Sequence, residues 1–184
     1  SDIDAFLSPA PLQLVIECAS PDAVRAHTKT VLSNGKDLLL MSSGALTDSA
    51  LFLALASLAE QQRCRFMVPS GALGGIDAIR AVRRHLTKVT LTTTKSPRSL
   101  QGAPGFKEWE TREISEAQVI FEGPAVEAVK LFPANVNVAA TLSLAGLGPE
   151  KTTVKVVADP ASSSNVHEVV AKGDFGVLRF LMEL

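Results

Sequence analysis

The first half of the chain alternates short continuous apolar runs with longer stretches of helical periodicity. The apolar runs at 12–20, 37–43 and 64–70 lack the polar alternation of a strand with one wet face, so they predict strands buried in a parallel sheet. Helical patterns follow the first two runs, at 20–33 and 46–62. Strands and helices that alternate at this spacing predict right-handed crossovers and an α/β fold.

Both helices carry signals at their ends. Ser20 is expected to cap the first helix, Pro21 fits its first position, and Gly35 supplies a left-handed residue that stops it. Thr47 is the expected cap of the second helix. The first two strands are therefore each followed closely by a helix.

A glycine-rich turn, "SGALGG" at 70–75, opens a third helical pattern. Its glycines do not have the G-x-G-x-x-G spacing of a dinucleotide fingerprint, and no Lys-Ser/Thr pair follows them. A phosphate-binding role is therefore disfavoured. We expect instead that this turn lets a cofactor or substrate approach the backbone closely.

The pattern changes near residue 95, where a turn-rich stretch leads into strands joined by short turns and one helical hairpin. This predicts a partial dinucleotide-binding (Rossmann-type) domain at 1–95 and an α+β substrate and catalytic domain at 96–184, with a mixed or antiparallel sheet. The second domain is expected to contain strands at 117–123, 152–159, 165–173 and 175–184, packed against helices at 124–131 and 136–147.

Composition and charge narrow the functional classes. The 184 residues carry a formal net charge of −1, which lacks the basic footprint of a nucleic-acid binder. Cys18 and Cys64 lie inside apolar runs, which predicts reduced, buried thiols and a cytoplasmic protein. The N-terminus has no basic start and no apolar signal core. We therefore expect a cytoplasmic protein with no nucleic-acid and no membrane partner.

The longest charge-free run, 131–149, is also not a membrane anchor, because its apolar helical part is too short to span a bilayer. It predicts a buried helix. Asn135 is explained as the N-cap of that helix. Asn137 is a second amide near the positive end of the helix dipole, where it could hold a carboxamide or carboxylate of a ligand.

Small residues follow each of the three early strands, in "ECAS", "MSSGAL" and "PSGALGG". Open parallel sheets bind ligands at the carboxyl ends of their strands, but small residues are also common in tight turns. Both explanations remain open for any one turn. Because three consecutive strands end this way, Ala19 and Ser43 are candidate cofactor contacts.

His167 lies in an alternating strand pattern. A strand histidine is usually partly buried with one satisfied hydrogen bond, but an imidazole also titrates near neutral pH. Glu168 should point to the opposite face, so Asp159 is the better candidate to orient the ring. His27 and His85 are expected to be structural. No cysteine or histidine pair has metal-ligand spacing and no serine occupies a G-x-S-x-G elbow, so no metal is expected.

The ordered motifs "PSGALGGIDAI", "VIFEGPA", "FPANVNVAATLSLAGLG", "VVADP", "NVHEV" and "GDFG" resemble the L-aspartate dehydrogenase family, from "LVIECAS" to the end of the chain. The resemblance implies an NAD- or NADP-dependent oxidoreductase that oxidises L-aspartate to iminoaspartate, which hydrolyses to oxaloacetate and ammonia or feeds pyridine nucleotide synthesis. It also implies that His167 is the catalytic histidine, and that Ala72 and Asn137 contact the cofactor.

The sequence departs from the family pattern at both ends, because the G-x-G-x-x-G turn and the closing segment are not found in it. Activity of these 184 residues alone is therefore an open question. Two alternatives follow: a cofactor-free remnant that acts as a dimerising or binding module, and a related homoserine-type dehydrogenase. Ser70, Lys95 and Arg98 are candidate ligands for the substrate carboxylates. The half-covered sheet of the second domain predicts a homodimer.

Overall fold

The computed structural model describes residues 3–8, 12–133 and 136–184, without the side chain of Val136. The chain divides into two compact units, Ser1–Pro69 and Ser70–Leu184. Each unit has its own sheet, so each is described by itself. Asn135, the expected helix cap, lies outside the described residues.

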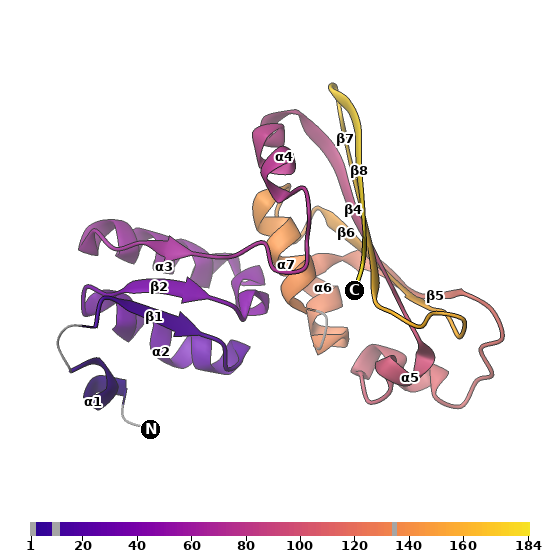
Figure 1. Cartoon of the computed structure of the whole chain (residues 1–184), viewed down its shortest axis with the longest axis horizontal. Coiled ribbons are helices and arrows are strands. Elements are labelled where there is room, and N and C mark those ends of the chain that lie inside the picture. Colours follow the sequence, from indigo (N-terminus) through magenta and orange to yellow (C-terminus); the bar gives the residue numbers. More distant parts are fainter. Residues whose placement is uncertain (1–2, 9–11, 134–135) are drawn as a thin grey trace. The chain divides into compact units, whose positions relative to one another are not determined.

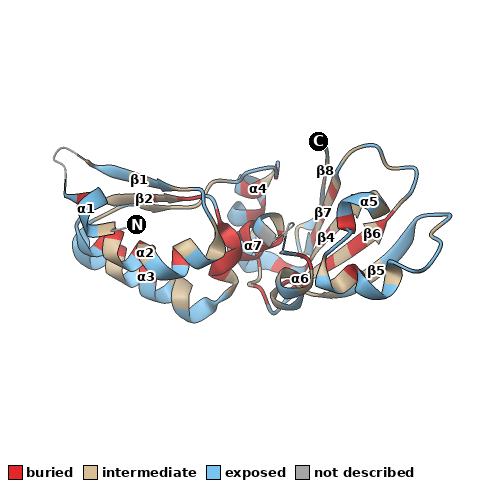
Figure 2. Cartoon of the chain, turned by 90° about the horizontal axis from the view of Figure 1, so that it is seen from below, coloured by how far each residue is buried: buried red, intermediate tan, exposed pale blue. Residues whose placement is uncertain are grey.

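The first unit contains a three-stranded parallel sheet in the order β1-β2-β3 (Figure 1). Helices α2 and α3 cover one face of this sheet (Figure 2). This confirms the predicted alternation of parallel strands and helices. The elements are α1 (Ile3–Leu7), β1 (Leu14–Glu17), α2 (Pro21–Ser33), β2 (Asp37–Leu40), η1 (Ser43–Thr47), α3 (Ser49–Gln62) and β3 (Phe66–Met67).

The ends of α2 are as predicted, but the start of α3 is not. Ser20 Oγ accepts a hydrogen bond from Ala23 N at 3.1 Å, and Gly35 adopts φ 69° after the last turn. At α3 the cap is Asp48, whose Oδ1 accepts from two backbone N–H groups of the first turn at 3.0 Å. The Thr47 prediction was wrong because its hydroxyl donates back to Gly44 O and closes η1.

Strand β1 is less buried than its apolar sequence predicts. Leu14 and Ile16 are 38% and 56% exposed, because alternate side chains of a strand share a face and helices α2 and α3 cover the other face of this sheet. The prediction of buried thiols was also wrong. Cys18 follows the end of β1 and is exposed, and Cys64 is half-buried before β3; both are free.

The second unit is built on a five-stranded mixed sheet in the order β5-β6-β4-β7-β8, in which only β4 and β6 run parallel. This confirms the expected fold class, an α/β chain with a partial Rossmann-type sheet followed by an α+β unit. The elements are α4 (Ile76–Ala81), η2 (Arg83–His85), β4 (Leu86–Lys95), α5 (Pro97–Leu100), η3 (Pro104–Trp109), β5 (Gln118–Pro124), α6 (Ala125–Leu131), α7 (Val136–Ala145), β6 (Thr152–Ala158), β7 (Val166–Gly173) and β8 (Gly176–Glu183).

The division between the units falls at 69/70 and not near the predicted residue 95. The reason is the pairing of β4, which lies in the middle of the second sheet between β6 and β7. In the sequence, β4 follows a helical segment, and this pattern predicts one more strand of the first sheet. The glycine-rich turn and α4 therefore also belong to the second unit.

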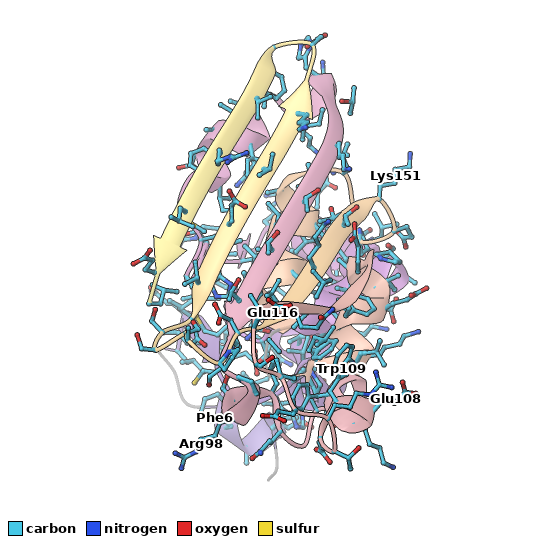
Figure 3. All side chains as sticks on the ribbon, turned by 90° about the vertical axis from the view of Figure 1, so that its right-hand side faces the viewer. Phe6, Arg98, Glu108, Trp109, Glu116 and Lys151 are labelled. Carbon is cyan, nitrogen blue, oxygen red and sulfur yellow. The ribbon has the colours of Figure 1, made fainter. Side chains whose placement is uncertain are left out.

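The core of the second unit lies between one face of its sheet and helices α6 and α7 (Figure 1). Within the described residues of this unit, the opposite face carries no helix (Figure 3). Helix α7 is the buried helix expected from the charge-free run (Figure 2). No helix in the described part of the chain is long and apolar enough to cross a membrane.

Candidate active site

His167 and Thr93 form a buried polar pair near the end of strand β4 and the start of strand β7. They lie directly opposite each other on β7 and β4, and their side chains are 4% and 2% exposed. His167 Nδ1 lies 3.0 Å from Thr93 Oγ1, within hydrogen-bond distance. One side-chain hydrogen bond therefore holds the imidazole in a largely buried position.

The direction of this hydrogen bond decides which ring nitrogen is basic. When Thr93 Oγ1 accepts from Nδ1–H, Nε2 is the basic nitrogen; when the hydroxyl donates to Nδ1, Nε2 carries the proton. Among the described residues, Thr93 is the hydrogen-bond partner of the ring, and it contacts Nδ1. Nε2 is therefore the nitrogen available for proton exchange.

Lys95 acts electrostatically on this pair. It lies two residues after Thr93 on β4, and residues two apart on a strand share a face. Burial, with a smaller contribution from the Lys95 charge, lowers the pKa of His167 below its ordinary value of 6.5. Burial also lowers the pKa of Lys95. The imidazole is therefore mainly neutral near pH 7, the form that accepts a proton.

The partner of His167 differs from the predicted one. Asp159 was the candidate, but its Oδ1 accepts a hydrogen bond from Ala161 N at 2.9 Å and so closes the turn after β6. Thr93 takes its place. The sequence holds a signal for it, because Thr93 continues the buried positions Val89 and Leu91 along one face of an alternating strand.

The turn that contains Ala72 packs against the hairpin that carries His167. Gly74 lies close to Met182, because a Cβ at this position would lie 3.8 Å from Met182 Sδ. Met182 is the cross-strand neighbour of His167 on β8. Ala72 itself is exposed. The structure thus brings this predicted cofactor contact to the same hairpin as the histidine.

The glycines of this turn are explained by packing and backbone conformation. Gly75 adopts φ 76°, and a Cβ at this position would collide with the Phe180 ring. Glycine at position 75 is therefore explained by packing against Phe180, whereas the sequence analysis explains it by close approach of a ligand. Gly71 also has a positive φ, of 60°, with open space around it.

Asn137 begins helix α7, as expected, and is exposed. Two residues later, Ala139 lines a small cavity that Thr93 lines from the sheet. The first turn of α7 therefore lies across from the histidine's partner. The turn of Ala72 thus approaches the cross-strand neighbour of His167, and the helix of Asn137 approaches Thr93.

In the first unit, Ala19 and Ser43 follow the ends of two neighbouring parallel strands, since Glu17 pairs with Leu40. Ala19 is exposed, but Ser43 is only 2% exposed and offers a ligand little surface. The sequence analysis missed Glu17. Its carboxylate accepts four hydrogen bonds of 2.8–3.0 Å, from Ala19 N, Ser20 N, Ser42 N and Ser42 Oγ.

The structure gives less support to the other residues suggested as ligands for the substrate carboxylates. Ser70 and Arg98 are exposed, and Arg98 extends away from the sheet (Figure 3). His85 pairs with Asp174 at 3.0 Å, as a structural surface residue would. The described residues contain no group of three or more histidine, cysteine, aspartate or glutamate side chains that could hold a metal ion.

Two family models match the chain. Residues 77–184 match the C-terminal domain of aspartate dehydrogenase, and residues 1–69 match the NAD binding domain of homoserine dehydrogenase. The gap between the two matches coincides with the division between the two compact units. Each unit thus has its own counterpart among known proteins.

Individual relatives extend the likeness across most of the chain. It is 44% identical over 180 residues to an L-aspartate dehydrogenase of Nitrosopumilus maritimus, covering 97% of this chain and 66% of that protein. It is 50% identical over 175 residues to an L-aspartate dehydrogenase of Methanosarcina barkeri, covering 94% of this chain and 65% of that protein. The chain therefore spans about two thirds of the length of these curated relatives.

A solved structure supports the same assignment. The aspartate dehydrogenase of Thermotoga maritima superposes with a TM-score of 0.83 at 34% sequence identity, over 95% of this chain and 70% of that one. A fold match and sequence identity of this extent, together with the family model over 77–184, lead to one conclusion. The chain belongs to the aspartate dehydrogenase family.

Proposed function

We propose that this chain is part of an NAD- or NADP-dependent L-aspartate dehydrogenase. The reaction removes a hydride from the α-carbon and a proton from the amine of L-aspartate, giving iminoaspartate, which water converts to oxaloacetate and ammonia. Iminoaspartate would also supply pyridine nucleotide synthesis. The observation that carries the proposal is the buried imidazole of His167, within hydrogen-bond distance of Thr93, in a member of this family.

His167 is the proposed general base. A substrate ammonium must lose a proton before its α-carbon can release a hydride, and Nε2 is the available nitrogen of a mainly neutral ring. Thr93 Oγ1 would accept from Nδ1–H and so keep Nε2 basic. The same bond would then stabilise the imidazolium that forms when the ring accepts the proton.

A nicotinamide cofactor, when bound, supplies the hydride acceptor. The proposed contacts in this chain are Ala72 and Asn137 in the second unit and Ala19 in the first. All three are exposed, and small side chains at two of them leave the backbone open to a ligand. Ser43, being buried, would act by shaping the turn after β2. Glu17 would hold the backbone around Ala19 in one conformation.

The proposed function is tested with the protein from the complete reading frame. NAD(P)⁺ reduction is followed with L-aspartate, L-homoserine and L-glutamate, and NADH binding by fluorescence titration. Turnover with L-aspartate supports the proposal. Preference for L-homoserine favours a homoserine-type dehydrogenase. The match of residues 1–69 to the NAD binding domain of homoserine dehydrogenase is the observation in favour of this alternative. Absence of saturable NADH binding favours a cofactor-free module.

His167→Ala tests the assigned base. Loss of general-base catalysis lowers kcat by roughly 10²- to 10⁴-fold. NADH affinity should remain close to that of the parent protein, because the ring is not a proposed cofactor contact. His85→Ala, which changes an exposed histidine that pairs with Asp174, is the control and should keep full turnover. A His167→Ala variant that retains turnover would overturn the acid–base role.

We also infer that the protein is a cytoplasmic homodimer. The second unit leaves one sheet face without a helix, and Val177 and Leu181 on β8 are 58% and 62% exposed. Open sheets of this kind are often covered by a second copy. The free thiols, one of them exposed, suit a reducing compartment. Sedimentation velocity that finds a monomer at micromolar concentration would exclude the dimer.

A further inference from the structure

Lys95 is a partly buried cation without a partner in the described part of the chain. Its side chain is half-buried, and it makes neither a salt bridge nor a side-chain hydrogen bond with the described residues. Other basic side chains do find carboxylates: the exposed Arg65 pairs with Asp37, and Lys155, half-buried like Lys95, pairs with Glu122. A half-buried unpaired ammonium loses hydration without compensation.

The acidic residue closest in register does not neutralise this charge. Lys95 pairs with Ala158 on β6, and Asp159 follows directly. Asp159 N donates to Lys95 O at 2.8 Å, but the Asp159 carboxylate accepts from Ala161 N within its own turn. The backbones of the two residues are joined while their opposite charges remain unpaired.

Lys95 also lies on the same sheet face as the His167–Thr93 pair. It shares a strand face with Thr93, and Thr93 holds His167. The positive charge of Lys95 is felt by the imidazole and helps to lower its pKa. An anion bound to this ammonium would therefore lie close to the group proposed to accept the substrate's proton.

We propose that Lys95 is the anchor for a carboxylate of the substrate beside His167. This assignment rests on the proposed function, which requires a dicarboxylic substrate. Of the three candidate ligands suggested by the sequence, Lys95 is half-buried on the histidine's side of the sheet, whereas Ser70 and Arg98 are exposed. A carboxylate bound here would supply the counter-ion that the described residues do not.

The test compares Lys95→Met with Lys88→Met in the protein from the complete reading frame. Lys88 is a matched control, because it lies on the same strand but is exposed. Binding of succinate, a dicarboxylate without the amine, is measured by calorimetry against its neutral diamide. Lys95→Met should raise the succinate Kd by roughly 10- to 100-fold and abolish the preference over the diamide. Lys88→Met should leave both unchanged.

Two further measurements separate anchoring from a structural role. Lys95→Arg keeps the charge and should keep most of the succinate affinity. In Lys95→Met, loss of the positive charge should raise the pKa of His167, moving the acidic limb of the kcat/KM profile to higher pH. The urea midpoint should not fall, because methionine removes the cost of burying the ammonium.

The outcomes distinguish this inference from the proposed function. If Lys95→Met binds succinate as tightly as the parent protein, Lys95 is not the anchor, whether or not L-aspartate is oxidised. If succinate binding depends on Lys95 but L-aspartate is not oxidised, the anion site stands and the proposed reaction fails. If Lys95→Met both raises the KM for L-aspartate and loses succinate affinity, the result supports the anion site and the proposed reaction together.

Discussion

A single hydroxyl decides how the imidazole of His167 can act. Without a hydrogen bond at Nδ1, the ring of a buried histidine could rotate, and Nε2 would point to substrate only part of the time. Thr93 lies in register with His167, and its 3.0 Å contact with Nδ1 restrains the orientation of the ring. We therefore regard Thr93 as a positioning residue that acts through His167.

Thr93→Val tests this role, because valine keeps the β-branched shape and removes the hydroxyl. Loss of one buried hydrogen bond, worth about 1–3 kcal/mol when a polar partner is left unsatisfied, should lower kcat by roughly 5- to 150-fold. KM for L-aspartate should change little. Thr92→Val, one residue earlier on the opposite face of β4, is the control. Equal kcat in both variants would argue against the positioning role.

At the scale of elements, Glu17 joins three segments at the end of the first unit's sheet. Its carboxylate binds the backbone after β1, the N-cap residue of α2 and Ser42 just before η1. Backbone N–H groups at a strand-to-helix turn have no strand partner, so a fixed carboxylate replaces water there. The conformation of both turns depends on this one side chain.

Glu17→Gln should therefore destabilise the first unit. The amide keeps one acceptor oxygen but presents an NH₂ group to backbone donors, and hydrogen bonds to a charged group contribute about 1.5–3 kcal/mol each. We expect the free energy of unfolding to fall by about 1.5–3 kcal/mol, measured by urea denaturation followed by far-UV circular dichroism. Glu60→Gln, on the exposed surface of α3, should show no change. An unchanged midpoint for Glu17→Gln would mean that the turns are held by other contacts.

The helices and their ends could be predicted from neighbouring residues, whereas the pairing between strands could not. The Ser20 cap, the Gly35 stop and the buried α7 follow from residues next to each other in sequence. The choice of Thr93 over Asp159 as the histidine's partner depends on a β4–β7 register between residues 74 positions apart. Nothing local encodes that register, so the sequence could name His167 but not the group that holds it.

At the scale of the whole molecule, the same limit explains the displaced boundary. Strand β4 follows a helical segment just as β2 and β3 do, and only its pairing with β6 and β7 assigns it to the second sheet. The hydrophobic core that contains Val89 and Leu91 draws its buried residues from 73–171, entirely within the second unit. A unit with its own sheet and core meets the physical requirement for independent folding.

We therefore expect residues 70–184 to fold without the first unit. The chain's single tryptophan, Trp109, packs against the second core and reports its unfolding by fluorescence. The fragment should unfold cooperatively in urea with the same Trp109 transition as the longer chain. A fragment that starts at the sequence-predicted boundary, residues 96–184, lacks β4 and so loses the strand between β6 and β7; it should show no cooperative transition. If 96–184 folded and 70–184 did not, the division at 69/70 would be wrong, and with it the assignment of the His167–Thr93 pair to a self-contained core.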